Sequence, residues 1–221
     1  MAAYLANVGV NASHAARSRL RQDGSFTLLP IPETTPWRAP MLRLRDVCGD
    51  TVEVPRGWLD RAVHADPDLR SAPATYGDNC ATAGRAYSLR AAQPGDTIFF
   101  VARLHPVYAA AGFYLVGRLR IDAVAANLTK DPGPGWWNAN AHVRRARATG
   151  AWNRFWVFRG DQSSGFLSAA IPFRKADAEL VFGGWTWSQT RSELQTIASH
   201  TRAVRRLTGA AEAALVELAG G

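Results

Sequence analysis

The most regular alternation of apolar and polar residues lies at positions 115–121. Its leucine and isoleucine residues alternate with Arg118 and Arg120, the period of two that is typical of a strand with one buried face. Gly117, within this run, indicates a close approach by another part of the backbone. We therefore expect a half-buried strand with a basic outer face.

A second strand precedes this one and starts from a tight turn. Pro94 and Gly95 suit the two central positions of a type II turn, because Pro fixes the first φ and Gly accepts the positive second φ. The apolar run 97–100 follows shortly afterwards. The pattern thus predicts a pair of neighbouring strands that forms one wall of a small barrel.

The rest of the pattern predicts further strands and helices. Gly24 marks a hairpin turn, and the prolines from 30 to 40 predict an extended loop. The final segment repeats apolar residues at spacings of three and four, which is the helical period. The expected strands cover 3–10, 26–32, 152–158 and 178–182, and the expected helices cover 81–89 and 192–218.

These elements predict an α+β fold, a bent and mostly antiparallel β-barrel of about five to seven strands with peripheral helices and a C-terminal helix. We expect a main domain over residues 1–190 and a helical extension over 191–221 packed on it. The runs 93–100 and 112–121 resemble the central hairpin of the PUA-like superfamily, to which the EVE and ASCH domains belong. This resemblance implies a PUA-like barrel that holds a nucleobase in an aromatic-lined pocket.

The basic charge of the chain is concentrated in its middle. The net charge is +8 over 221 residues, and the segment 103–159 holds nine basic and two acidic residues. Tryptophans at 136, 137, 152 and 156 interleave with these arginines, a combination suited to phosphate contact and base stacking. The alternative is a set of arginine-solvated faces with no such role.

Composition also argues against several other classes of protein. The apolar window 97–117 is interrupted by Arg103, His105 and Pro106, so it does not predict a membrane span. The first residues lack the pattern of a signal peptide, which makes the cytoplasm the expected location. Cys48 and Cys80 have no metal-binding spacing, so we expect two free thiols, no metal site and no cofactor.

Polar residues gather in three groups, and each group alone is typical of turns and helix caps. The first follows the opening strand, the second combines three carboxylates with an imidazole and a phenol, and the third follows a tryptophan pair. The groups cover 7–18, then 64–68 with 75–79, and 138–145.

Taken together, these motifs resemble the nucleotide modification associated domain type 3 family over about residues 4 to 180. The order of the motifs is more specific than any one of them. The resemblance implies a role with modified nucleotides in prokaryotic or phage modification systems, alongside other proteins of such systems. The motifs are Tyr4–His14, Asp23–Phe26, Pro30–Glu33, His64–Pro67, Thr75–Asp78 and Asn140–His142.

The first functional hypothesis is a reader that binds a modified base without changing it. Aromatic side chains would stack on the base, polar groups including Asp78 would recognise its edge, and arginines would contact phosphate. The expected base-binding residues are Asn11, Ser13, Tyr76, Phe100, Trp137 and His142, and the expected phosphate-binding residues are Arg103, Arg144 and Arg145.

The second hypothesis is an enzyme, and the third is a DNA-binding subunit. His14 or His64, with Asp66 or Asp78 as the orienting carboxylate, would supply general acid–base chemistry for a hydrolase or transferase. The catalytic candidates are therefore His14, His64 and Asp78. Alternatively, the basic face binds duplex DNA through its backbone alone, within a modification or restriction complex. The sequence leaves the three hypotheses open.

Overall fold

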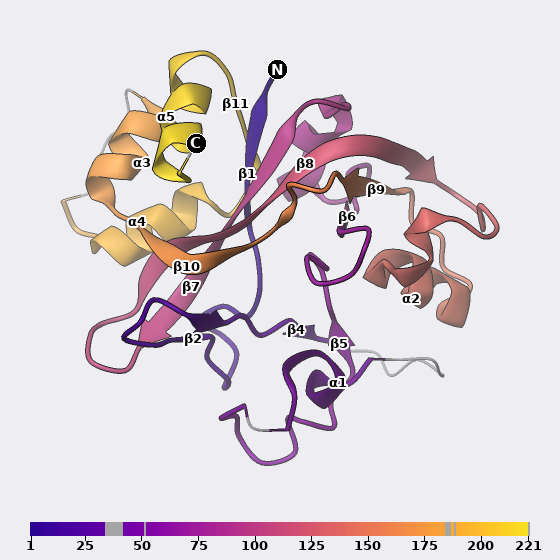
Figure 1. Cartoon of the computed structure of the whole chain (residues 1–221), viewed down its shortest axis with the longest axis horizontal. Coiled ribbons are helices and arrows are strands. Elements are labelled where there is room, and N and C mark those ends of the chain that lie inside the picture. Colours follow the sequence, from indigo (N-terminus) through magenta and orange to yellow (C-terminus); the bar gives the residue numbers. More distant parts are fainter. Residues whose placement is uncertain (34–41, 51, 184–186, 188, 221) are drawn as a thin grey trace.

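The computed structural model describes residues 1–33, 42–50, 52–183, 187 and 189–220 (Figure 1). The strands are β1 (Ala3–Asn7), β2 (Arg19–Leu20), β3 (Phe26–Thr27), β4 (Ile31–Pro32), β5 (Val63–His64), β6 (Thr75–Asp78), β7 (Thr97–Pro106), β8 (Gly112–Leu128), β9 (Phe155–Gly160), β10 (Gly165–Phe173) and β11 (Arg205–Leu207). The helices are α1 (Leu44–Cys48), α2 (Ala141–Thr149), α3 (Lys175–Phe182), α4 (Glu193–His200) and α5 (Ala210–Leu218), with 3₁₀ helices η1 (Gly84–Ala91) and η2 (Trp136–Ala139). The α+β class predicted from the sequence is confirmed.

One large sheet organises the fold. Its strands follow the hydrogen-bonded order β11-β1-β7-β8-β9-β6, with β10 paired to β8 and β2 paired to β7. The described pairs are antiparallel, except that β7 runs parallel to β1 and to β2. Among the described strands the order ends at β11 and β6 without joining them. The expected closed barrel is therefore not found in this part of the chain, and the sheet is open.

The sheet is nevertheless curved, because side chains on strands that are not neighbours share one core. Strands β1 and β7 are buried on both faces. Tyr4 and Phe100 share a core with Phe158 of β9, although β9 lies two strands beyond β7 in the sheet. Leu5 and Phe99 point to the other face and pack against α3, α4 and α5. Figure 1 shows these three helices grouped beside β1, while α2 lies on the opposite side near β6 and β9.

The turns that the sequence predicted are present. Gly95 has φ +94° just before β7, and Gly24 has φ +82° between β2 and β3. At Gly117 a Cβ would lie 2.6 Å from Leu69 Cδ1 and 2.9 Å from the Gly165 carbonyl oxygen. The close backbone approach expected at this glycine is confirmed.

The predicted strand 178–182 is wrong, because this segment belongs to helix α3. The backbone N–H of Arg174 donates to Asp177 Oδ2 at 2.8 Å and so closes the helix start. Ala178 and Val181 are then buried at a spacing of three, which fits one helical face. The prediction was wrong because the short apolar run at the end of α3 was interpreted as a strand.

The continuous helix predicted over 192–218 is also wrong. The chain forms α4, then strand β11, then α5, and Leu207 pairs with Ala3 of β1 instead of extending a helical stripe. Buried strands need hydrogen-bond partners at both edges. Strand β11 supplies the second partner for β1, and this tertiary requirement overrides the local helical period.

A smaller layer at the bottom of Figure 1 contains α1 and the two-stranded sheet β4–β5. Its core is formed by Leu29, Leu44, Trp58 and Val63 together with residues that follow β1. This layer places the end of β4 and the end of β5 near α2. No helix among the described residues has the length and apolar character that crossing a membrane requires.

Candidate functional site

The candidate site lies on the outer face of β6, next to α2. The neighbours of Gly77 in β6 turn toward the main core, so Gly77 faces the opposite side. A Cβ at Gly77 would lie 2.7 Å from His142 Cδ2, 2.9 Å from Asn140 Oδ1 and 3.2 Å from Asp66 Oδ2. The missing side chain lets polar groups from separate segments pack directly on the strand.

Helix α2 places His142 over this strand. Asn140 is the N-cap, and its fully buried side chain accepts a hydrogen bond from the His142 backbone N–H at 3.0 Å. Such caps satisfy a donor of the first turn. The Asn140 amide also contacts Thr75 Oγ1 at 3.3 Å, and Val143 and Ala146 are buried in the cluster that includes β9. The start of α2 is therefore held by hydrogen bonds to the cap and to β6, and by apolar packing against β9.

The β4–β5 pair supplies the second imidazole and a carboxylate. Ile31 is opposite His64 in this antiparallel pair, so Glu33, just beyond β4, comes close to the His64 ring. His64 Nδ1 and Glu33 Oε1 are hydrogen-bonded at 2.9 Å. Since an ionised carboxylate can only accept, Nδ1 donates this hydrogen bond, and Nε2 is the ring nitrogen on the Asp66 side.

Asp66 completes what we term the His–carboxylate cluster, formed by Glu33, His64, Asp66 and His142. Both Asp66 oxygens accept from the Gly77 backbone N–H, at 3.1 and 2.9 Å. Asp66 Oδ2 lies 3.8 Å from His64 Nε2 and 3.4 Å from His142 Nε2. The two imidazole rings are perpendicular, with centroids 4.5 Å apart. Four ionisable side chains thus meet at one point.

The cluster is largely withdrawn from solvent. The side chains of Glu33 and Asp66 are only 4% and 3% exposed. Burial raises the pKa of Asp66 well above its usual value, although the Gly77 N–H opposes the shift. Burial, helped by His64 and Arg145, holds the pKa of His142 well below its usual value. His142 is therefore a neutral imidazole near pH 7, the form that accepts a proton or binds a metal.

A polar cavity of about 210 Å³ adjoins the cluster, and His142 forms part of its wall. Arg145 also lines it and reaches toward the cluster, with Nη1 3.6 Å from Glu33 Oε2. Sites for drug-sized ligands usually measure about 300–1,000 Å³, so this cavity fits one base or one phosphate group. Asn79, Asn153 and Phe155 are also among its lining residues.

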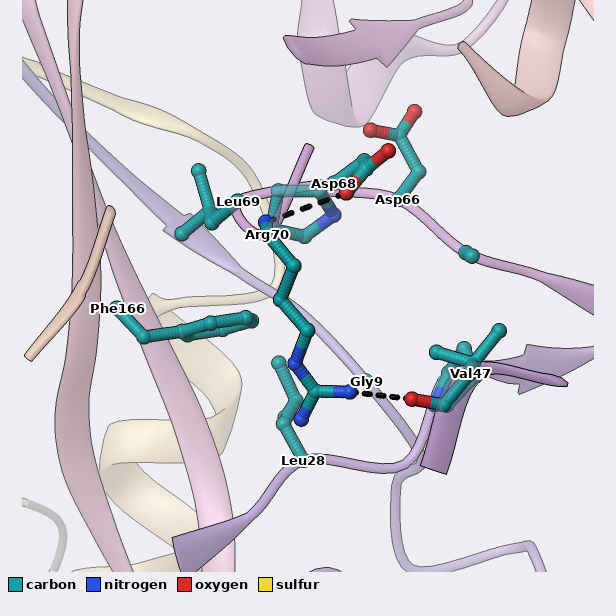
Figure 2. A pocket seen from close by; sticks show the side chains of 11 residues that line it. Gly9, Leu28, Val47, Asp66, Asp68, Leu69, Arg70 and Phe166 are labelled. Carbon is teal, nitrogen blue, oxygen red and sulfur yellow. Dashed lines mark hydrogen bonds between the residues drawn. The ribbon is translucent and has the colours of Figure 1, made fainter. Parts of the chain in front are cut away.

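Figure 2 shows a different and smaller pocket, of about 40 Å³, on the other side of the Asp66 segment. The Arg70 side chain runs through it, donates to the Val47 carbonyl oxygen, and lies over the Phe166 ring at 5.6 Å. The Asp66 carboxylate points away from Arg70 in this view. Arg70 therefore ties the Asp66 loop to the rest of the fold, and the carboxylate remains directed toward the cluster.

The first polar group of the sequence forms an exposed turn. Asn11 Oδ1 accepts from both the backbone N–H and the hydroxyl of Ser13, and the Asn11 N–H donates to His14 Nδ1. The His14 ring meets the edge of Trp58. The contacts that the structure gives to Asn11, Ser13 and His14 do not reach the His–carboxylate cluster.

Tyr76, Asp78 and Phe100 lie in or beside the main core. Phe100 is fully buried and Tyr76 is 4% exposed, with their rings packed edge to face at 5.2 Å. The Tyr76 hydroxyl donates to Asp78 Oδ2 at 2.9 Å, and Arg85 pairs with Asp78 Oδ1 at 3.0 Å. Strand alternation directs Tyr76 and Asp78 away from the face that carries His142.

The remaining predicted residues lie in three places. Trp137 donates from Nε1 to the Gly133 carbonyl oxygen and packs among residues of α2 and β9. Arg145 lines the cavity, and Arg144 is on the same helix. Arg103 lies instead on β7 beside Arg17 and His105, where burial and nearby arginines lower the His105 pKa to about 4.

Sequence reasoning singled out His64 and His142 but gave them separate roles. It missed Glu33 as the partner of His64, Gly77 as the contact surface, and Asn153 in the cavity wall. One usable signal was the His64-Ala65-Asp66 spacing, because alternate residues of an extended chain point the same way. The pairing of Glu33 with His64 depends on the β4–β5 register, which the sequence alone did not provide.

A comparison with protein families now adds to this geometry. The profile of nucleotide modification associated domain 3 matches residues 3–211 of the chain. The chain belongs to this family. The match spans every segment of the His–carboxylate cluster, and it confirms the resemblance inferred from the sequence motifs. No curated protein and no solved structure matches the chain.

Proposed function

We propose that this member of the nucleotide modification associated domain 3 family is an enzyme that processes a modified nucleotide, with the His–carboxylate cluster as its catalytic centre. The observation that carries the proposal is the meeting of two imidazoles and two carboxylates beside a polar cavity. Burying such groups is costly unless they are paired, and perturbed ionisable groups concentrate at functional sites. The association of the family with nucleotide modification supports a nucleotide as the substrate class.

In this proposal the cavity binds one part of the nucleotide and the cluster acts on it. Arg145 offers a guanidinium to a phosphate oxygen, since its 3.6 Å contact with Glu33 is longer than a hydrogen bond. His64, oriented by Glu33, presents Nε2 on the Asp66 side. Hydrolysis or group transfer at the base, the glycosidic bond or a phosphoester is the reaction class that suits this chemistry.

The reader hypothesis is the second candidate, and the cavity favours it as much as it favours the enzyme. Phe155 is the aromatic residue among those that line the cavity, whereas Tyr76 and Phe100 belong to the main core and do not line it. The proposal also includes a relationship between the curved sheet and the PUA-like fold, a cytoplasmic location, and other modification-system proteins as partners.

Turnover assays separate the enzyme from the reader. We expect the wild type to convert at least one member of a panel of modified nucleotides and oligonucleotides, as measured by chromatography of the products. His142→Gln should then reduce kcat by about 10²–10⁴-fold, the usual contribution of an acid–base group. His200→Gln is the matched control, because His200 lies at the end of α4 and is neither in the cluster nor among the residues that line the cavity. Binding without turnover across the panel would instead support the reader.

Arg145→Gln tests how the nucleotide is held. We expect about a tenfold or greater loss of affinity for a nucleoside monophosphate, because a charge-assisted hydrogen bond contributes about 1.5–3 kcal/mol. The parent nucleoside should lose much less affinity. Calorimetry on Arg145→Gln and on the exposed control Arg202→Gln would measure both. If affinity instead depends steeply on salt and equally on every arginine, the DNA-backbone hypothesis is the better one.

A further inference from the structure

The His–carboxylate cluster has the donor set of a metal centre, which the sequence did not predict. His64, Asp66 and His142 each offer one ligand atom, and these atoms lie within 4.8 Å of one another. Two imidazole nitrogens and one carboxylate oxygen are ligands that suit divalent first-row transition metals. Calcium and magnesium prefer sites made of oxygen alone.

The spacing of the donor atoms fits coordination better than direct hydrogen bonding. Asp66 Oδ2 lies 3.4 Å from His142 Nε2 and 3.8 Å from His64 Nε2. N–H···O hydrogen bonds are usually about 2.9 Å long. Ligand atoms around a tetrahedral ion are about 3.3–3.5 Å apart, because each bond is about 2.0–2.2 Å long. The two separations from Asp66 are near this value, and the two imidazole nitrogens lie within 4.8 Å of each other.

The surroundings of the three donors also match a metal site. Metal-bound histidines usually donate their other ring nitrogen to a carboxylate or carbonyl, as His64 Nδ1 does to Glu33 Oε1 at 2.9 Å. The Gly77 N–H holds Asp66 in place, and Asn140 fixes the start of the helix that carries His142. A divalent cation would also balance the two buried carboxylates, Glu33 and Asp66.

We propose that His64 Nε2, Asp66 Oδ2 and His142 Nε2 bind one divalent transition-metal ion. Three protein ligands leave a coordination position for water or a nucleotide oxygen, as in catalytic zinc sites. With the ion bound, both imidazoles would be ligands and not free bases, and the ion would supply the acid–base chemistry through Lewis acidity and a more acidic bound water. This role of the ion rests on the proposed function, whereas metal binding itself does not and can be tested without any nucleotide.

The test measures metal binding by the full chain after treatment with a chelator. We expect titration with ZnCl₂ to give one tight site per chain, and CoCl₂ to give the intense visible absorption of a four- or five-coordinate ion. His142→Ala should remove the tight site. Glu33→Gln, which retains all three ligands, should weaken affinity about 10–100-fold. His200→Gln should bind as the wild type does.

Each result bears on the proposal, even if His142→Ala does not fold. A wild-type cobalt spectrum typical of six water-like ligands, or a tight zinc site that persists in folded His142→Ala, would overturn the metal site, whereas zinc affinity unchanged in Glu33→Gln would contradict the orienting role of Glu33. Zinc that stabilises the wild type and His200→Gln against heat, but stabilises Glu33→Gln less at the same concentration, would support the metal site. A confirmed metal site with no turnover of any nucleotide would leave this inference standing and remove the enzymatic function.

Discussion

Replacing Gly77 with alanine is expected to abolish tight zinc binding and nucleotide turnover while the protein remains folded. The new Cβ would lie 2.7 Å from His142 Cδ2 and 2.9 Å from Asn140 Oδ1, closer than Cβ atoms come to other atoms in proteins, and a tight 3.2 Å from Asp66 Oδ2. The φ of Gly77 is not among the positive values, so alanine fits the backbone there. The nearest atoms belong to the side chains of His142, Asn140 and Asp66, and displacing these side chains dismantles the cluster.

The stability cost of this substitution should stay near the range of about 1–3 kcal/mol that is typical of overpacking. Gly165→Ala is the matched control, because Gly165 is also in a strand and a Cβ there meets nothing within 4 Å. Calorimetric zinc titration, product analysis and urea unfolding would be compared for both variants. Wild-type zinc affinity in folded Gly77→Ala would mean that His142 and Asp66 do not act together.

Much of the sheet could be predicted because its signals are local. The Pro94-Gly95 turn leads into β7, and the alternation at 115–121 lies within β8. The errors arose where tertiary contacts decide the outcome. Strand β11 forms because β1 requires a second hydrogen-bonded neighbour. The helical spacing of leucines and valines in this segment cannot predict that long-range pairing. Closure of the barrel likewise depends on pairing between distant strands.

The candidate site was only partly predictable for the same reason. His64 and Asp66 share one short segment, and they form one of the base–carboxylate pairs that the sequence left open. His142 joins them only because β6 pairs with β9 and α2 packs beside that pair. The role of Gly77 is visible only when the atoms opposite its missing side chain are known. Long-range register, which short motifs do not encode, therefore assembles this chemistry.

Strand β6 separates two polar networks that look alike in the sequence. Gly77 faces the His–carboxylate cluster, whereas Asp78 faces the main core and is 1% exposed. Asp78 accepts hydrogen bonds from the Tyr76 hydroxyl, the Asn79 backbone N–H and Arg85. Each acceptor oxygen is thus occupied by protein donors. This arrangement indicates that Asp78 stabilises the core, although the sequence suggested it as a catalytic residue.

Asp78→Ala is accordingly expected to destabilise the protein strongly. It leaves the buried Tyr76 hydroxyl without its acceptor, which costs about 1–3 kcal/mol, and it opens a cavity beside Tyr76 that adds to this cost. Arg85 contributes less, because its side chain is 52% exposed and can turn to water. Urea unfolding should therefore show a large loss in the free energy of unfolding, while kcat per folded molecule falls far less than in His142→Gln.

A double-mutant cycle with Tyr76→Phe isolates the buried hydrogen bond in this prediction. Once the Tyr76 hydroxyl is gone, Asp78→Ala no longer leaves that donor unsatisfied, so its cost should shrink by about 1 kcal/mol or more. Both residues lie in the same strand and touch at 2.9 Å, close enough for such coupling. Additive costs would show that the hydroxyl finds another acceptor in the core. A folded, stable Asp78→Ala protein that has lost turnover would show that Asp78 is a catalytic residue. It would contradict the conclusion that the two polar networks on opposite faces of β6 have separate roles.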